Sequence, residues 1–334
     1  METLDTVISI IIPAYKTPEV LLQRCLKSIE EQNDTHVEVI IVFDGAPQFE
    51  IKQLLSDHQT LLLHYKIVNH AGVSHARNIG LSQAKGGYVM FVDADDALPL
   101  GAIEALRKAM HDTQLAVGAF YKIQGNSKEL IQPSGDFDEE NVAVVDYRKG
   151  VLLPDTGNGL LWNKMYSLNV ILDKRIYFDE NLSIAEDSEF VYRYLSAVDK
   201  IKITDEPVYM YIRNSGSTVN SFDKEYENKV LKSMEKMRQD VTSTSGLDES
   251  YISTYYTFHI LLIIVHYIFN PTNGWNGKKR RKEYMDLWNV TNKYISKSKK
   301  NTFNLSKKIA IWCFQYRLFT LSCIIAWIRN RQIA

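Results

Sequence analysis

Three carboxylates crowd the end of one apolar run in the chain. Asp93, Asp95 and Asp96 lie within four residues, at the end of the segment 88–93. Carboxylates this close repel one another unless a cation or hydrogen bonds compensate their charge. Their hard oxygen atoms suit Mg²⁺ or Mn²⁺, which also take phosphate oxygens and can neutralise a departing diphosphate. The alternative interpretation is that these aspartates cap a helix that begins near Pro99.

Three further sites carry charged side chains at the end of a predicted strand or the start of a predicted helix. Asp44 ends another apolar run, where it could accept an N–H from a nucleobase or only stabilise the turn at Gly45. Arg77 lies near a helix start, where a guanidinium could hold phosphate or a base carbonyl, or pair with an acid on the surface. Glu186 and Asp187 begin a later helix, a position that favours acids electrostatically without any catalytic role.

The elements that must position these residues alternate along the first part of the chain. Short apolar runs predict strands, and the segments between them show helical spacing. The predicted strands are 7–12, 38–43, 61–68, 88–93 and 115–120, and the predicted helices are 18–32, 74–85 and 99–110. This order indicates an α/β protein whose parallel sheet has helices on both faces. Ligands of such sheets bind at the carboxyl ends of the strands, where the charged residues fall.

Length and composition narrow the class of protein. The chain has 334 residues, 45% hydrophobic and 24% charged, which suits about two globular domains and excludes a disordered chain. Cys25, Cys313 and Cys323 indicate free thiols in a reducing compartment. No export signal is visible, which predicts the cytoplasm. No GxGxxG follows the first strand and no GxxxxGK[ST] occurs, which disfavours dinucleotide-binding and P-loop folds.

Five segments in a fixed order resemble a known family. They are SIIIPAYKT (9–17), VIIVFDGA (39–46), SHARNIGLSQAKGGYVMFVDADD (74–96), WNKMY (162–166) and AEDSEFVYRY (185–194). Together they resemble the family 2 glycosyltransferases, especially bacterial enzymes that build capsules, exopolysaccharides, lipopolysaccharide or wall teichoic acid. The resemblance implies a GT-A fold, a Rossmann-like and mostly parallel sheet with helices on both faces, followed by a helical C-terminal region.

The resemblance implies roles for residues of the donor site. The implied nucleotide-sugar-binding positions are Pro13, Ala14, Tyr15, Asp44, Asn69, Arg77, Asp93, Ala94 and Asp95. The first three would wall the pocket, Asp44 would face the uracil ring, and Asn69 and Arg77 would lie near the base or diphosphate. Asp93 would point toward ribose and metal, and Asp95 would be the direct ligand of Mn²⁺ or Mg²⁺.

The resemblance places the chemistry of transfer on the later segments. Asp187 would be the general base, and the cleft for donor sugar and acceptor would involve Trp162, Asn163, Glu186 and Arg213. Many relatives add a histidine as a metal ligand, expected here within 209–222, but no histidine occurs between His111 and His259. The third ligand therefore stays open, with water as the alternative. The implied reaction is an inverting transfer from a UDP-sugar to a hydroxyl of a glycan or lipid-linked acceptor.

The predicted organisation has three parts. Residues 1–112 would be the nucleotide-sugar-binding half of the GT-A domain, 113–222 the acceptor-binding half, and 223–334 a helical, basic region. Two other functions stay open. A sugar-phosphate nucleotidyltransferase is disfavoured because the loop after the first strand is not rich in glycine. A non-catalytic subunit of a glycosyltransferase pair is disfavoured because Asp95 and Asp187 are both present.

The C-terminal region is strongly basic. Residues 270–334 hold 14 lysines and arginines against two acids, a net charge of +12, which leaves −13 for the rest. Such asymmetry indicates an anionic partner. The segment 258–269 is too short to span a bilayer, and 309–328 carries Arg317 and a polar stripe, which favours an amphipathic or packed helix.

We therefore expect a peripheral protein at the inner face of the bacterial membrane, held to anionic lipid by residues 258–334. The alternative is that these helices form a homo-oligomer or bind a partner subunit. Nucleic acid is disfavoured as a partner because the aromatic-rich repeats of known binding modules are absent.

Overall fold

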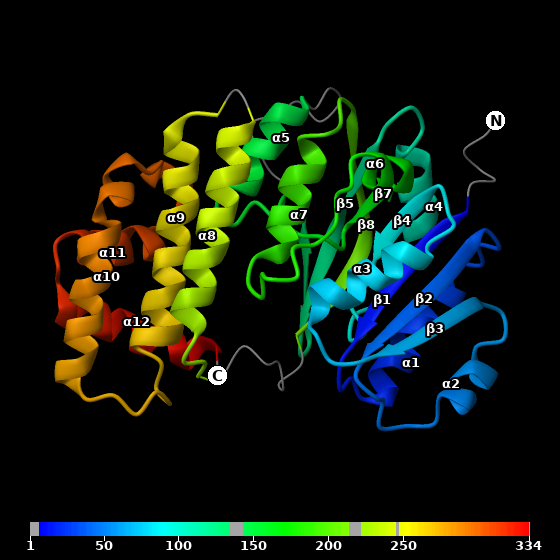
Figure 1. Ribbon diagram of the computed structural model, residues 1–334, viewed down its shortest axis with the longest axis horizontal. Helices are drawn as coiled ribbons and strands as arrows, with labels where there is room; N and C mark the ends of the chain where they lie inside the picture. The colour runs from blue at the N-terminus through cyan, green and yellow to red at the C-terminus, as the bar shows by residue number, and fades with distance from the viewer. Residues whose placement is uncertain (1–6, 134–142, 214–221, 245–246, 334) are drawn as a thin grey trace. The chain divides into compact units, whose positions relative to one another are not determined.

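The chain folds into a unit that holds the sheet and a unit of helices (Figure 1). The structure is a computed structural model that describes residues 7–133, 143–213, 222–244 and 247–333. The sheet unit comprises Met1–Arg148 and Asn158–Ser215, and the helical unit comprises Lys149–Gly157 and Gly216–Ala334. The predicted helical region beginning at 223 corresponds to most of the second unit.

The sheet runs in the order β3-β2-β1-β4-β7-β5-β6, with β8 paired to β5. Its strands are β1 (Ile8–Ala14), β2 (Val37–Asp44), β3 (Leu62–Val68), β4 (Tyr88–Phe91), β5 (Leu115–Gln124), β6 (Ser127–Ile131), β7 (Lys164–Ser167) and β8 (Ile201–Ile212). The first four strands pair in parallel, as predicted. The short β7 lies antiparallel between β4 and β5, so the sheet is mixed and joins the halves predicted on either side of residue 112.

Helices cover both faces of the sheet because its central strands are apolar on both sides. The helices of this part of the chain are α1 (Glu19–Glu30), α2 (Ile51–Asp57), α3 (Val73–Gln83), α4 (Ala102–Ala109), α5 (Val144–Val151), α6 (Leu168–Asp173) and α7 (Glu186–Leu195). Ile8, Ile10 and Ile12 of β1 share one core with α1, α2 and α4. Ile11, between them, faces α3 on the opposite side.

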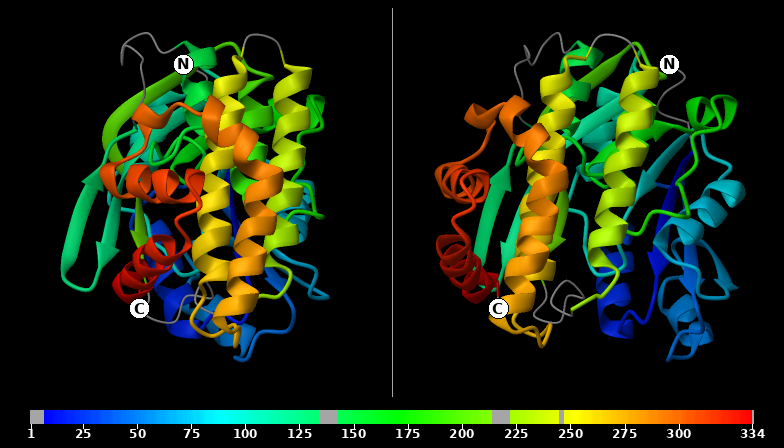
Figure 2. Two further views of the ribbon diagram at one scale, coloured as in Figure 1. Left: turned by 90° about the vertical axis from the view of Figure 1, so that its left-hand side faces the viewer. Right: turned by 60° about the vertical axis from the view of Figure 1, so that its left-hand side comes forward.

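The second unit is a group of packed helices (Figure 2). They are α8 (Tyr226–Ser243), α9 (Glu249–Ile263), its π-helical continuation η2 (Ile264–Ile268), α10 (Gly277–Lys297), the 3₁₀ turn η3 (Lys300–Thr302), α11 (Leu305–Gln315) and α12 (Phe319–Ile333). The segment predicted as one helix over 309–328 is two helices, because Arg317 between them adopts a left-handed φ of 58°.

The apolar segment 258–269 lies in the interior of this unit. It falls in α9 and η2, and none of its residues is exposed. Within the described part of the chain, one helix, Glu249–Ile268, is long and apolar enough to cross a membrane, and 72% of its apolar window is buried. Its apolarity is therefore accounted for by packing inside the protein.

Gly80 allows α3 to lie close against β1, and this contact provides a test of the fold. A Cβ atom at position 80 would collide with the side chain of Ile11. We expect Gly80→Ala to lower the free energy of unfolding by about 1–3 kcal/mol because the core must shift to accept it. Denaturant unfolding of the full chain measures the change.

The matched control is Gly277→Ala, in the first turn of α10, where an added Cβ meets no atom within 4 Å. Alanine is the better helix former, so this variant should be at least as stable as the native chain. Equal stabilities of the two variants would contradict the close packing of α3 on β1.

Candidate active site

The turn after β4 holds the three crowded aspartates in different environments. Asp95 is exposed and Asp93 half-buried, whereas Asp96 is 2% exposed. The Asp96 carboxylate accepts hydrogen bonds from the Tyr209 hydroxyl and the Ile212 backbone N–H, both at 2.8 Å. The Tyr209 hydroxyl in turn accepts the backbone N–H of Asp93 at 3.0 Å. Asp96 and Tyr209 therefore fix the turn to β8 and leave Asp93 and Asp95 as its accessible carboxylates.

The alternative interpretation of these aspartates as helix caps is wrong. Helix α4 begins at Ala102, its N-cap residue is Gly101, and no side chain accepts a cap hydrogen bond there. Burial, followed by the charge of Asp93, raises the pKa of Asp96 to about 8. Asp96 thus acts as a buried hydrogen-bond acceptor within the turn.

Arg77, on α3, lies at the centre of the candidate site. Its side chain is 3% exposed, so the alternative of a surface ion pair is wrong. One terminal nitrogen, Nη1, donates to Asp187 Oδ1 at 2.5 Å and lies 3.5 Å from Glu186 Oε1. The other, Nη2, donates to Asp93 Oδ1 at 3.2 Å. A single buried guanidinium therefore joins the first aspartate after β4 to the two acids that begin α7.

The charges around Arg77 do not balance. Burial by itself lowers the pKa of Arg77, but the charges of Asp187 and Asp93 outweigh it and raise that pKa. Burial raises the pKa of Asp187 from 3.8 to about 7, in opposition to Arg77 and with help from Glu186 and Asp93. The Asp187 side chain is still 28% exposed. It is therefore accessible, and its pKa suits a proton acceptor near neutral pH.

Unusual backbone conformations precede α3 and α7, the two helices that carry Arg77 and Asp187. Ala185, directly before Glu186, has a left-handed φ of 58°. Such a conformation is uncommon for a residue with a side chain and costs energy that the surroundings must compensate. Gly72, directly before α3, has a φ of 101°, which glycine adopts without strain. The chain thus turns sharply into each helix that supplies the cluster.

Asp44 helps to build the turn before α3. Its carboxylate accepts the backbone N–H groups of Ala71 at 2.7 Å and Gly72 at 3.0 Å, and it lies 2.8 Å from Nδ1 of His70. The ring of Tyr15 stacks on the ring of His70, with 4.0 Å between their centroids. Asp44 therefore has a structural role toward residues 70–72, and a uracil ring would have to share its oxygens.

The structure gathers the implied donor-site residues at one edge of the sheet. Pro13 and Ala14 end β1, Asp44 ends β2, the exposed Asn69 follows β3, and Asp93, Ala94 and Asp95 follow β4. Because these four strands are parallel, their carboxyl ends meet on the same side. This is the location at which open α/β sheets bind ligands.

Trp162 and Asn163 are buried rather than open to a ligand. Trp162 is 5% exposed and stacks on Tyr209 with 4.2 Å between ring centroids. Asn163 donates to the carbonyl of Gly118 at 2.8 Å and accepts from Nζ of Lys164 at 2.8 Å. Their contribution to a cleft is therefore through the support of neighbouring residues. Arg213 follows β8 and is exposed. The residues 214–221, where a further metal ligand is expected, lie outside the described residues.

Sequence reasoning missed two residues of this region, Tyr209 and Lys164. Lys164 is fully buried, and burial lowers its pKa to about 7 against the opposing charge of Asp187. Its Nζ also donates to the carbonyl of Leu160 at 2.5 Å. The only signal for Lys164 was its place in WNKMY, and nothing in the pattern distinguished Tyr209 from other strand tyrosines.

The carboxylates fit a divalent ion by their chemistry. Within the described ranges, no three His, Cys, Asp or Glu side chains form a metal-binding group. Asp93 and Asp95 nevertheless offer two hard oxygen ligands on one turn. When all three acids are ionised, Arg77 with Asp93, Glu186 and Asp187 carries two excess negative charges. A magnesium-type ion that takes its other ligands from phosphate and water suits such a site.

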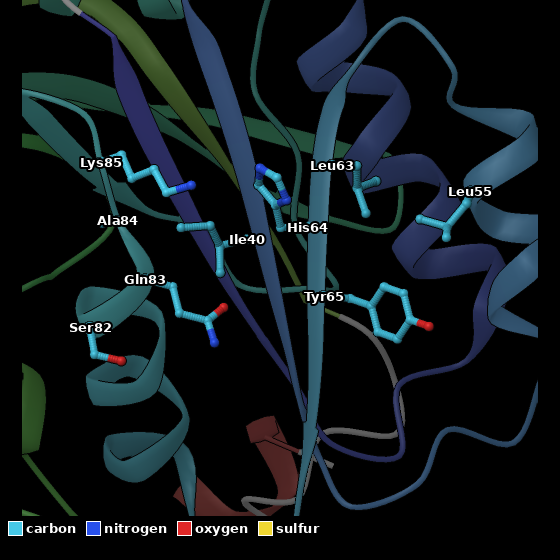
Figure 3. Close-up of a pocket in the computed structure, with 9 residues that line it drawn as sticks. All are labelled: Ile40, Leu55, Leu63, His64, Tyr65, Ser82, Gln83, Ala84 and Lys85. Atoms are coloured by element: carbon cyan, nitrogen blue, oxygen red, sulfur yellow. The ribbon is translucent and has the colours of Figure 1, made fainter.

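A hollow of about 570 Å³ lies elsewhere on the sheet, between β2, β3 and the end of α3 (Figure 3). Its lining residues are Ile40, Leu55, Leu63, His64, Tyr65, Ser82, Gln83, Ala84 and Lys85. None of the implied site residues lines it. The hollow is therefore separate from the cluster around Arg77.

The family model described as Glycosyl transferase family 2 matches residues 9–166, which include β1 to β4 and the aspartates after β4. This part of the chain is a family 2 glycosyltransferase domain. The resemblance drawn from the five sequence segments is confirmed.

The chain is similar to bacterial proteins along much of its length. The uncharacterized glycosyltransferase EpsJ of Bacillus subtilis is 26% identical over 225 residues, 63% of this chain and 62% of EpsJ. The glycosyltransferase GlyG of Streptococcus pneumoniae is 25% identical over 74% of this chain and 84% of GlyG. A crystal structure of TarS from S. aureus, residues 1–349, matches 98% of this chain and 92% of its own, with a TM-score of 0.66 at 16% identity. This likeness confirms the predicted GT-A fold.

Removal of the Arg77 cation should destabilise the protein in a pH-dependent way. Arg77→Met leaves buried carboxylates without their partner, so we expect a loss of about 3–5 kcal/mol above neutral pH. The folded-state pKa of Asp187 is raised from 3.8 to about 7, so its ionisation opposes folding fully above that range and not below it. The loss should therefore shrink as the pH falls. Unfolding curves of the native chain and of Arg77→Met, recorded well below and well above pH 7, measure how this loss of stability changes.

The control is Arg238→Met, which breaks the exposed pair of Arg238 with Glu235, 2.6 Å apart. It should change stability little at any pH because exposed ion pairs contribute little. An Arg77→Met variant that is equally destabilised at every pH would contradict the unbalanced carboxylate cluster.

Proposed function

We propose that this glycosyltransferase transfers a sugar from a UDP-sugar to a hydroxyl of a glycan or lipid-linked saccharide, with inversion at the anomeric carbon. The observation that carries the proposal is the pair of hydrogen bonds from Arg77 to Asp187 and Asp93. Through these bonds Arg77 connects Asp187, the candidate general base, to Asp93, which belongs to the candidate diphosphate site. Crystal structures of TarS with UDP-GlcNAc and with UDP support the donor class.

Each part of the cluster has a distinct role in the proposed reaction. The nucleotide binds over the ends of β1, β2 and β3, against Tyr15 and Asn69. Asp93 and Asp95 would hold Mn²⁺ or Mg²⁺, and a bound ion would supply positive charge for the departing diphosphate. Arg77 orients Asp187 through Oδ1 and keeps its negative charge close to the sugar. Arg213, exposed after β8, approaches the diphosphate.

The proton moves in one direction through this arrangement. An acceptor hydroxyl gives its proton to Asp187 as its oxygen forms a bond to C1 of the sugar. The bond from C1 to the UDP oxygen breaks, and UDP takes the electron pair. Attack from the side opposite the leaving group inverts the configuration at C1. General base catalysis of this kind supplies roughly 10²–10⁴-fold.

The relatives favour a role in the synthesis of a bacterial surface polysaccharide, with the enzyme in the cytoplasm. TarS, for example, is a poly(ribitol-phosphate) beta-N-acetylglucosaminyltransferase that is 25% identical to this chain over 299 residues. A non-catalytic subunit is the remaining alternative. Calorimetric binding of UDP-sugars without turnover across a panel of acceptors would favour that alternative.

Two substitutions should separate binding from chemistry. Asp187→Asn keeps the shape of the side chain but cannot accept a proton at neutral pH. We expect near-native UDP affinity and a turnover reduced by about 10²–10⁴-fold. Asp95→Ala removes a metal ligand, so UDP affinity in the presence of Mn²⁺ should fall together with turnover. UDP-release assays and calorimetry measure the two effects.

Glu186→Gln is the matched control, since Glu186 is the neighbouring acid and lies farther from Arg77, at 3.5 Å. It should lose much less turnover than Asp187→Asn, because Glu186 is implied for the cleft and not as the general base. Undiminished turnover in Asp187→Asn, with loss in Glu186→Gln, would move the base to Glu186 and contradict the assignment.

The donor nucleotide can be tested without an acceptor. We expect UDP with Mn²⁺ to raise the melting temperature more than GDP, CDP or dTDP. The reason is that Asp44, Asn69 and Arg77 occupy the positions implied for the base and diphosphate. Removal of the metal with EDTA should reduce the shift. A larger shift with GDP would exclude the uridine nucleotide.

A further inference from the structure

The last two helices carry an apolar surface that the described residues of the helical unit leave exposed. On α11 the exposed side chains are Leu305 (74%), Ile309 (47%), Trp312 (52%) and, at its end, Tyr316 (60%). Their spacing of four, three and four residues places them on one side of the helix. Ile311 and Phe314 of the same helix are buried. The exposed residues therefore form a second apolar side, beyond the one that packs inside the unit.

Helix α12 repeats this arrangement. Its exposed apolar residues are Leu321 (46%), Ile324 (50%), Trp327 (54%) and Ile328 (47%), while Ser322 and Ala326 are buried. α11 and α12 pack against each other and lie side by side in both views of Figure 2. We call the eight residues from Leu305 to Ile328 the α11–α12 face. The other exposed large apolar residues of the described chain are scattered over many elements, which is normal for a protein surface.

Exposed basic residues flank this face, and the nearest acid that contacts α11 is Asp155, which pairs with the buried Lys307. No Asp or Glu follows Asp286 in the chain. Lys308 is exposed on α11, and Arg317 is exposed in the turn between the helices. The basic run 278–282 belongs to the first turns of α10, and α10 contacts α12 where the Tyr284 hydroxyl lies 2.7 Å from Oγ of Ser322. The surface therefore combines apolar side chains with a concentrated positive charge.

We propose that the α11–α12 face docks on an anionic phospholipid bilayer, with both helices parallel to its surface. Exposed Trp and Tyr side chains favour the interface between lipid headgroups and acyl chains. Lysine and arginine next to them can extend to the phosphates while their aliphatic parts cover apolar surface. Each basic residue near an anionic bilayer adds attraction that weakens with salt.

Lipid fits this face better than the other occupants. A second copy of the chain would bring two regions of like charge together, which opposes association. A membrane span is excluded by length, since α11 has 11 residues and α12 has 15 against about 20 needed. The proposal is independent of the sugar-transfer reaction. It also narrows the membrane contact predicted over residues 258–334 to residues 305–328, and leaves out the buried segment 258–269.

Vesicle co-sedimentation of the full chain tests the proposal. The chain should pellet with vesicles of phosphatidylglycerol and phosphatidylcholine in equal parts, and much less with phosphatidylcholine alone. Added salt should weaken binding without abolishing it, because the apolar contribution remains. The double variant Trp312→Gln/Trp327→Gln should lower the partition coefficient at least about tenfold.

The matched control is Val20→Gln/Leu100→Gln, which changes two apolar residues of the sheet unit that are 71% and 75% exposed. It should bind vesicles as the native chain does. Melting curves show whether each variant is folded. Native binding by the Trp312→Gln/Trp327→Gln protein would overturn the proposal.

A second measurement tests the same face with a variant that still binds vesicles. Brominated lipids should quench the tryptophan fluorescence of the native chain. Trp312→Phe/Trp327→Phe should still pellet with vesicles but lose most of this quenching. If the native chain ignores anionic vesicles at low salt and Trp312→Gln/Trp327→Gln turns a dimer into a monomer in ultracentrifugation, the face is a contact between copies and the proposal is wrong.

Discussion

The candidate site depends on one buried cation. Arg77 is 3% exposed, and its guanidinium hydrogen-bonds both Asp93 and Asp187. Without it, carboxylates from two distant parts of the chain would face each other in a region of low polarity, at a large cost in free energy. With it, burial still raises the pKa of Asp187, helped by the charges of Glu186 and Asp93. The excess negative charge of the acids suits the site to a divalent ion. The same interaction thus holds the site together and prepares its chemistry.

The rest of the sheet unit serves to hold this cation and its partners in place. Gly80 lets α3 approach β1, and the carboxylate of Asp44 fixes the turn from which α3 begins. Asp96 and Tyr209 tie the turn after β4 to the end of β8. These supporting residues are buried and fully engaged, whereas Asp95 and part of Asp187 are open to solvent. Rigid support behind accessible carboxylates is what a site for a diphosphate donor requires.

Much of this arrangement could be predicted from local sequence. Parallel strands buried on both faces read as continuous apolar runs, so β1, β2 and β4 and the charged residues after them were found. The edge strand β3 was also found from its apolar run, although most of its residues are exposed. Features that depend on contacts between distant parts of the chain could not be predicted. β7 has four residues and owes its antiparallel place to its neighbours, and nothing near Arg77 shows that its partner lies 110 residues away. The break at Arg317 depends on a left-handed backbone that no apolar pattern reveals.

Diffraction from crystals of the full chain with UDP and Mn²⁺ would show whether the cluster around Arg77 binds the donor. We expect one anomalous manganese peak between the diphosphate and the carboxylates of Asp93 and Asp95. We also expect Arg77 to keep its contact with Asp187 and the uracil ring to lie near Tyr15. A nucleotide in the hollow beside β3, or manganese away from Asp95, would show that the donor binds elsewhere.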